Sequence, residues 1–380
     1  MKKRYYYFLL PFLVDMSAGI ALFCFPLYAK EYLHLNALAI GLIAASLGCL
    51  YTALNLLFEK IEKILKIERL IPLGLSLITV SYISLNLIKG APAFIFIFSL
   101  AAIGHALFWP AFEAHLALGK SEKIKKRNLG YFNLGWSTGL TISGPLLGGL
   151  IYGMAGPKTF LLSGLIALSG LALTLVHFKE EIPLPDQGLS LPANPRPFDM
   201  KLLYLIWISN FLSFLIINTL RTFFPLLGLE MKISAGFIGF VLFLPGLAQI
   251  LMTLFLKNNP GWSYNLRAII WAEGLAILGL VLLGLSKTIL IISLGLFLPG
   301  FMAGITNYSS NLMSLSQEDH GKRRIGIHEA LVGLAGIYSG FWGGTISKVL
   351  GLRAPYISCA FLIAGAIIIQ LIAAKRLDYQ

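Results

Sequence analysis

Twelve long apolar runs, each bounded by charged residues, constrain this chain more than any other feature of its sequence. A run of about 20 apolar residues is long enough to cross the hydrocarbon core of a bilayer as a helix. Helices suit that environment because their backbone N–H and C=O groups are paired within the segment. We therefore predict an all-α polytopic membrane protein with twelve transmembrane helices. These expected helices, numbered 1 to 12, lie near residues 6–29, 36–58, 70–88, 92–118, 129–153, 159–178, 202–229, 235–256, 267–286, 288–315, 326–350 and 355–374.

The basic residues fall mainly in alternate loops between these runs. If the N-terminus lies inside, 22 of the 30 Lys and Arg residues are in inside segments, 7 are outside, and Arg221 lies within an apolar run. The positive-inside rule then predicts cytoplasmic termini for a multi-pass protein of the cytoplasmic (inner) membrane. The net charge of +13 is spread over separate loops and forms no single basic face, so we expect no nucleic-acid partner.

The second half of the chain repeats the first in two places. The segment FPLYAKEYLHLNALAIG, from Phe25, returns as FPLLGLEMKISAGFIG, from Phe224. The segment KKRNLGYFNLGWSTGLTISGPLLGG returns as KRRIGIHEALVGLAGIYSGFWGG. Duplicated halves are a common build of secondary transporters. We therefore predict two six-helix pseudo-repeats, at residues 1–179 and 201–380, joined by a Pro-rich, charged cytoplasmic linker at 180–200.

With six plus six helices, a central linker and basic loops after helices 2, 4 and 10, the chain resembles the major facilitator superfamily of secondary transporters. That family carries the signature Gly-x-x-x-Asp-Arg-x-Gly-Arg-Arg after helix 2. The matching stretch here is FEKIEKILKI, in which Glu62, Lys63 and Lys66 hold the acidic and basic places. Phe58 and Leu65 replace both glycines, so the signature is degraded. The resemblance implies that helices 1, 4, 7 and 10 line a central cavity, and we expect a monomer in the lipid bilayer.

Helix 5 contains the stretch SGPLLGG, whose glycines and proline would weaken a helix in water. In a bilayer, small residues let helices approach closely, and that contact supplies association energy. Pro145 is expected to add a kink. The ending Gly-Pro-x-x-Gly-Gly resembles the helix 5 motif of drug/proton antiporters in this superfamily, which favours export; a packing role without directional meaning is the alternative. The packing motif comprises Gly135, Gly139, Gly144, Pro145, Gly148 and Gly149.

Polar residues inside the apolar runs are the candidate transport residues. A charge at mid-membrane costs about 2.5 to 3.5 kcal/mol, so each one needs a cavity or a partner. Asp15 lies about nine residues into helix 1, close to the bilayer midplane. We interpret it as a carboxylate that carries a proton or binds a cation, with a buried polar pair as the alternative.

Helix 4 carries an imidazole, aromatic rings and a carboxylate at helical spacing. His105, Trp109 and Glu113 follow one another at four-residue intervals and therefore share a face. We expect this face, with the rings of Phe108 and Phe112, to line the cavity. The alternatives are a structural hydrogen bond for His105 and a position at the cytoplasmic interface for Glu113.

Helices 7 and 10 carry polar stripes at helical spacing, which fits their expected place at the cavity. Glu273, on the peripheral helix 9, is expected to pair with a basic residue of a cytoplasmic loop, such as Arg267 six residues before it. The candidate residues on helices 7 and 10 are Asn210, Asn218, Arg221, Asn307 and Asn311.

The sequence gives no support for an enzyme. The stretch HEALV, from His328, begins like the zinc-hydrolase motif HExxH but has Val332 where the second histidine is required. There is also no GxxxxGK[ST] run for ATP binding, and we expect no metal and no cofactor.

We interpret the chain as a secondary active transporter, with proton-coupled efflux of a small organic compound as the first hypothesis. Proton-coupled uptake of a small metabolite is the alternative, favoured if Arg221 binds an anionic substrate. A non-transporting receptor or scaffold of the same fold is a further alternative.

Overall fold

The computed structural model describes residues 3–117, 122–177, 200–314 and 321–376, and the secondary structure in these ranges is entirely helical. The all-α prediction is therefore confirmed. The first half contains α1 (Lys3–Glu31), α2 (Ala37–Leu56), α3 (Phe58–Ile64), α4 (Ile67–Leu85), α5 (Ala91–Ala117), α6 (Glu122–Ser137), the π-helical η1 (Thr138–Ser143), α7 (Gly144–Ala155), η2 (Gly156–Lys158) and α8 (Thr159–His177). The second half contains α9 (Met200–Glu230), α10 (Ala235–Leu242), α11 (Leu244–Asn258), η4 (Pro260–Tyr264), α12 (Leu266–Leu285), α13 (Ile289–Phe297), α14 (Pro299–Ser314), α15 (Gly321–Leu350) and α16 (Ala354–Arg376).

Ten segments of the described residues are long and apolar enough to cross a membrane. The segment Gly130–Val176 contains two crossings, because α7 and α8 are separated by a turn at Gly156, where φ is +55°. The helix α15 is also long enough, although its glycines, polar residues and Glu329 keep it out of that set. Together these segments give the twelve crossings predicted from the sequence.

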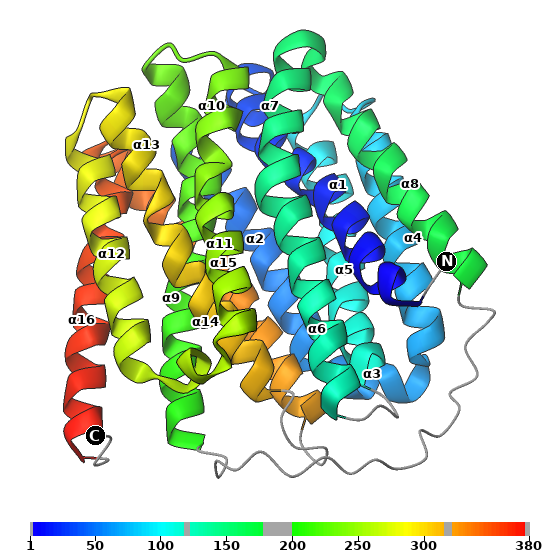
Figure 1. The fold of residues 1–380 in the computed structure, drawn as a ribbon. Helices are drawn as coiled ribbons and strands as arrows, with labels where there is room; N and C mark the ends of the chain where they lie inside the picture. Colours follow the sequence, from blue (N-terminus) through cyan, green and yellow to red (C-terminus); the bar gives the residue numbers. More distant parts are fainter. Residues whose placement is uncertain (1–2, 118–121, 178–199, 315–320, 377–380) are drawn as a thin grey trace.

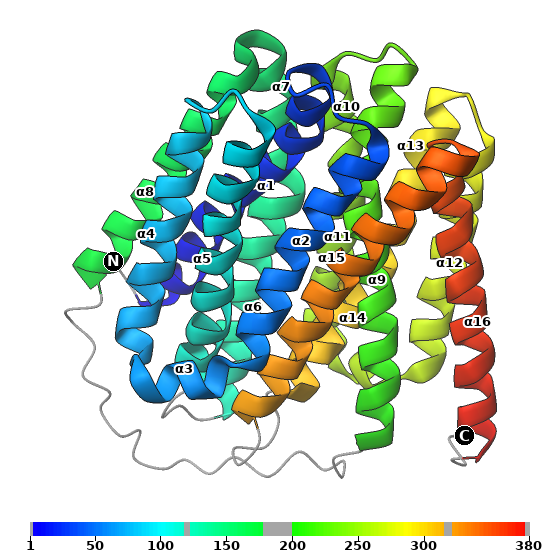
Figure 2. The same cartoon turned by 180° about the vertical axis from the view of Figure 1, so that it is seen from behind.

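The helices form two bundles that stand side by side (Figures 1 and 2). In the first bundle, α4 and α8 lie on the side away from the second bundle, and α12 and α16 lie on the opposite outer side of the second. The bundles meet where α2 runs along α15, where α7 runs along α10, and where α1 touches α9. We call the end of the molecule that carries α3 the α3 end, and the opposite end the far end.

The turns at the far end support the internal repeat. Among the described non-glycine residues, His34 and Lys232 have positive φ angles, of 52° and 60°. They occupy the same position in the two halves, at an offset of 198 residues. The helices that follow are capped at the same offset, because the side chains of Asn36 and Ser234 accept hydrogen bonds from Ala39 N and Phe237 N respectively. The predicted linker, 180–200, lies outside the described residues except for Met200, where α9 begins.

The helix-packing motif lies on the long interrupted helix α6–η1–α7. A Cβ atom built on Gly144 would lie 2.5 Å from Gly19 Cα of α1, so the two backbones are in direct contact. Gly135 and Gly139 also abut the α1 backbone, and Gly148 lies over the ring of Phe23. These contacts hold the first bundle together.

The helix has a widened turn just before Pro145, where a kink was expected. The residues Thr138–Ser143 are π-helical, and the Gly144 N–H donates to the carbonyl of Gly139 instead of to that of residue 140. Because Pro145 has no N–H, the carbonyl four residues earlier lacks its usual partner, which accounts for a relaxed turn at this place.

Glycines also mediate the contacts between the bundles at the far end. Gly149 faces Gly239 of α10, and Gly41 of α2 faces the backbone at Gly340 of α15. Gly41 and Gly239 are equivalent positions of the repeat. The two bundles therefore touch at the far end through two related backbone contacts that leave no room for side chains.

Candidate transport site between the two bundles

Asp15 lies midway along α1 and is 4% exposed. Its carboxylate interacts electrostatically with Arg221 on α9 of the other bundle and with Glu329 on α15. Within the part of the chain that the structure describes, Asp15 has no hydrogen bond and no ion pair. An unpaired carboxylate at this depth is costly unless it is protonated or a ligand or water satisfies it, and this makes Asp15 a candidate functional group.

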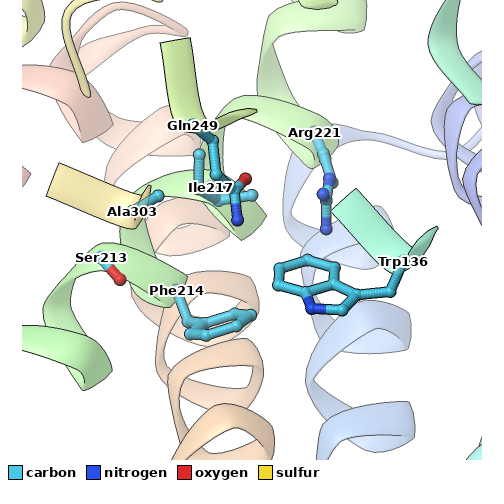
Figure 3. Close-up of a pocket in the computed structure, with 7 residues that line it drawn as sticks. All are labelled: Trp136, Ser213, Phe214, Ile217, Arg221, Gln249 and Ala303. Atoms are coloured by element: carbon cyan, nitrogen blue, oxygen red, sulfur yellow. The ribbon is translucent and has the colours of Figure 1, made fainter. Parts of the chain in front are cut away.

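Arg221 lines a small cavity between the two bundles (Figure 3). The volume of this cavity is about 10 Å³, which is about the space that one water molecule needs. The ring of Phe214 lies on one side of the Trp136 indole, and the guanidinium group of Arg221 points toward that indole. In this structure the cavity beside Arg221 is therefore too small to hold an organic substrate. The lining residues are Trp136, Ser213, Phe214, Ile217, Arg221, Gln249 and Ala303.

The asparagines predicted on α9 face α15, whereas those predicted on α14 make no hydrogen bond with another described residue. Asn210 is fully buried, and its Nδ2 lies 3.4 Å from His328 Nδ1. Asn218 faces the backbone of α15 at Gly336. Asn307 and Asn311 are each 5% exposed and make no hydrogen bond with another described residue.

A hydrogen-bonded network between the bundles was not foreseen from the sequence. The hydroxyl of Tyr51, on α2, donates to Glu329 Oε2, on α15. The other carboxylate oxygen of Glu329 lies 3.7 Å from His328 Nε2, and His328 Nδ1 lies 2.7 Å from the hydroxyl of Ser310. Glu329 is an acidic residue inside an apolar run, so the criterion that singled out Asp15 could have found it. Tyr51, Trp136 and Gln249 carry no comparable sequence signal.

The three residues of the face predicted for helix 4, which is α5 in the structure, contact different partners. His105 Nε2 lies 3.1 Å from the hydroxyl of Tyr82 on α4, a contact within the first bundle. Trp109 packs edge to face against Phe132 of α6 and is not among the residues that line the cavity. Glu113 lies near the α3 end, where it interacts electrostatically with Glu329.

The expectation that Phe108 and Phe112 present their rings to the cavity is wrong. Both side chains are fully buried and stack on each other, with ring centroids 5.5 Å apart. Phe112 also packs against Tyr6 and Tyr7 of α1. The two rings lie in the core of the first bundle, and α5 has apolar residues on all of its faces, so its sequence did not reveal which face points where.

Glu273 is fully buried on α12 and accepts a hydrogen bond of 2.8 Å from Gln370 Nε2 on α16. The expected pairing with a basic loop residue such as Arg267 is therefore wrong, since Arg267 is exposed and no ion pair joins the two among the described residues. Gln370 also donates to Ser209, which ties three helices of the second bundle together.

The degraded loop signature lies on the short helix α3 and the turn after it. Lys63 and Lys66 are exposed, and Glu62 is half-buried. The described residues contain no cluster of His, Cys, Asp and Glu that could hold a metal ion. In particular, His328 is engaged by Ser310 and Asn210.

Comparison with known proteins identifies the family. The sequence profile of the Major Facilitator Superfamily matches residues 7–204, which is more than half of the chain. No curated protein matches the chain in sequence.

Solved structures with the same architecture include the human organic anion transporter MFSD10 (TETRAN), with a TM-score of 0.73 and 16% identity over 97% of this chain and 98% of that one. A POT family transporter in complex with 5-aminolevulinic acid gives a TM-score of 0.75 and 15% identity, covering 98% of this chain and 95% of that one. The nucleoside transporter NupG gives 0.71 and 12% identity, covering 98% and 99%. At these identities the likeness shows the fold, and the family profile shows the relationship. This chain is a member of the Major Facilitator Superfamily, a family of membrane transporters.

Proposed function

We propose that the protein is a proton-coupled secondary active transporter that moves a small organic compound across the inner membrane by alternating access. Residues 1–179 and 201–380 would form the two moving halves, with both termini and the 180–200 linker in the cytoplasm. The observation that carries the proposal is the pair of opposite charges at the centre: Asp15 and Arg221, from opposite bundles, attract each other without forming an ion pair within the described residues.

This arrangement supports exchange of a proton for a substrate. When Asp15 is ionised, its attraction to Arg221 draws α1 and α9 together across the interface. A proton on Asp15 removes that attraction and leaves Arg221 without a charged partner among the groups that act on it. Because both groups lie at the contact between the bundles, a change in charge there acts directly on the equilibrium between open and closed states.

Export is the first hypothesis for the direction of transport. The motif that favours it lies at the contact between the bundles as well as inside the first bundle. Gly149 and the carbonyl of Pro145 face Gly239 of α10 across the interface. A close backbone contact at this place suits a seal that opens and closes as the bundles rock. The aromatic rings of Trp136 and Phe214 beside the cavity suit a flat, largely apolar substrate.

Uptake of an anionic metabolite by proton symport is the second candidate, and Arg221 favours it. The guanidinium group lines the cavity and makes no hydrogen bond or ion pair with another described residue. It could therefore hold a carboxylate or phosphate of a substrate in a two-pronged contact. In Arg221→Lys the charge would stay while the planar fork is lost, so binding of anions should weaken far more than binding of neutral compounds.

The proposal is tested by flux in reconstituted vesicles with an imposed pH gradient. A panel of amphipathic aromatic compounds and organic acids is offered to vesicles of either orientation, and Asp15→Asn is compared with wild type. We expect at least one compound to move in wild type with a rate that follows the pH gradient, and no gradient-driven movement in Asp15→Asn. A flux that does not depend on the pH gradient would contradict proton coupling, and a complete absence of flux would favour a receptor or scaffold.

A further inference from the structure

Two buried carboxylates near the α3 end interact across the contact between α5 and α15, which belong to opposite bundles, away from the cavity that Arg221 lines. Glu113 lies four residues before the end of α5, and Glu329 lies near the start of α15. Their exposed fractions are 4% and 7%. The two carboxylates interact electrostatically with each other. Tyr51 of α2 interacts electrostatically with both of them, and its hydroxyl donates a hydrogen bond to Glu329. Glu113 was a candidate transport residue from the sequence, whereas Tyr51 and Glu329 were not.

The hydrogen bonds around this pair are unequal. One carboxylate oxygen of Glu329 accepts a hydrogen bond from the Tyr51 hydroxyl, and the other lies 3.7 Å from His328 Nε2. Glu113 Oε2 is buried and has no hydrogen-bond partner. A negative charge is therefore better accommodated on Glu329, and Glu113 is the better place for a proton.

The contacts of His328, beside Glu329, fit a neutral ring. Asn210 Nδ2 lies 3.4 Å from His328 Nδ1 and can donate to it when the ring carries its proton on Nε2. That proton then faces Glu329. Among the described residues, the titratable groups that act on this pair are Tyr51, Asp15 and His328, while Arg221 acts on Asp15. Within the same part of the chain, no Lys or Arg forms an ion pair with Glu113 or Glu329.

We propose that Glu113 and Glu329 bind one proton between them, and that this proton is required for the two bundles to close at the α3 end. The inference rests on the proposed proton-coupled function and adds to Asp15 a second proton site, outside the central cavity, that controls closure. With the α3 end open, both carboxylates meet cytoplasmic water and are ionised. Closing takes up one proton from that water onto Glu113, and opening returns it.

Like charges brought together in a buried site disfavour the state that holds both of them. Removal of water strengthens this repulsion, because the effective dielectric constant falls. The Tyr51 hydroxyl stabilises the single charge that stays on Glu329, and it also ties α2 to α15 across the interface. The protonated pair therefore favours the closed α3 end, and raising the pH favours the open one.

The test measures the opening of the α3 end directly. Spin labels are attached at Lys60 of α3 and at Asn259 after α11, which are exposed and belong to different bundles. The three native cysteines are replaced in this background. Distances between the labels are measured by pulsed electron paramagnetic resonance in lipid nanodiscs, from about pH 5 to about pH 9. This range covers the pKa values of carboxylates that are shifted by their neighbours.

We expect the distance in wild type to lengthen as the pH rises. Glu113→Gln should stay closed over the whole range, because a single carboxylate with its tyrosine partner needs no proton. Tyr51→Phe should open at a pH lower by about one unit or more, since a hydrogen bond to a charged group is lost. Glu273→Gln is the matched control, a buried carboxylate inside one bundle, and should follow wild type.

The inference is overturned if the wild-type distance is independent of pH, if Glu113→Gln opens at the same pH as wild type, or if Tyr51→Phe leaves the midpoint unchanged. The vesicle assay distinguishes a failure of this inference from a failure of the proposed function. Proton-driven flux together with a pH-independent distance would refute the gate alone. A pH-dependent distance without proton-driven flux would refute the transport proposal and leave the proton-controlled closure in place.

Discussion

Replacing Gly239 by alanine would place a methyl group in the contact between the bundles at the far end. A Cβ atom at this position would lie 2.9 Å from Gly149 Cα and closer still to the carbonyl oxygen of Pro145. Ordinary contacts begin near 3.4 Å, so the two backbones must separate. Such overpacking costs about 1 to 3 kcal/mol.

This cost falls on the closed far end alone, because the two backbones part when that end opens. The better helix propensity of alanine is present in both states and cancels in their difference. At about 1.4 kcal/mol per factor of ten, the population of the open far end should rise by about 5-fold to about 150-fold. Thermal stability should change little, since the bundles can relieve the clash by separating.

Gly144→Ala is the matched control, because its Cβ would meet Gly19 of α1 inside the first bundle. That clash is present whether the far end is open or closed, so this variant should lose thermal stability and keep the wild-type distribution of states. The assay is the distance between spin labels at Lys89 and Lys287, exposed residues of the two bundles at the far end, together with a melting curve. The reasoning fails if Gly239→Ala melts early with an unchanged distance, or if Gly144→Ala shifts the distance as much.

Three further predictions follow from the site. Trp136→Ala should weaken substrate binding by about 2-fold to about 10-fold through the loss of ring contacts, whereas Trp109→Ala should leave affinity unchanged, as isothermal titration of a transported compound would show. Asp15→Asn should insert and fold yet show no uptake or release driven by a pH gradient in vesicles; wild-type flux would remove Asp15 from the mechanism. Glu273→Leu should lower stability by about 1 to 3 kcal/mol because the buried Gln370 amide loses a partner, with flux retained in the folded fraction; an unchanged melting curve would show that this hydrogen bond contributes nothing.

Much of the fold could be predicted because lipid imposes simple rules on a sequence. Each crossing needs a long apolar run, and those runs predicted the helices. The repeat of the FPL segments predicted two copies of one six-helix unit, and the turns at His34 and Lys232 share their backbone geometry. Glycines predicted close contacts, although not which helix each one would meet: Gly144 meets α1 of its own bundle, whereas Gly149 meets α10 of the other.

The site was harder to predict because a helix in a bilayer can be apolar on its lipid side and on its buried side alike. Periodicity therefore could not show that Phe112 packs inside a bundle while Trp136 lines the cavity. Partners across the interface are also remote in the chain. Tyr51 and Glu329 are joined only by the docking of two bundles, and HEALV was considered only as an incomplete metal motif.

The central claim is that proton and substrate act on the same pair of charges, Asp15 and Arg221. Its most direct test adds a transported compound to purified protein in weakly buffered detergent solution and follows the pH with an indicator dye. For exchange of proton and substrate, the account predicts that wild type releases about one proton per molecule bound, as expected for one titrating site, and that Asp15→Asn binds the compound without releasing a proton. Equal proton release from both proteins would contradict the account.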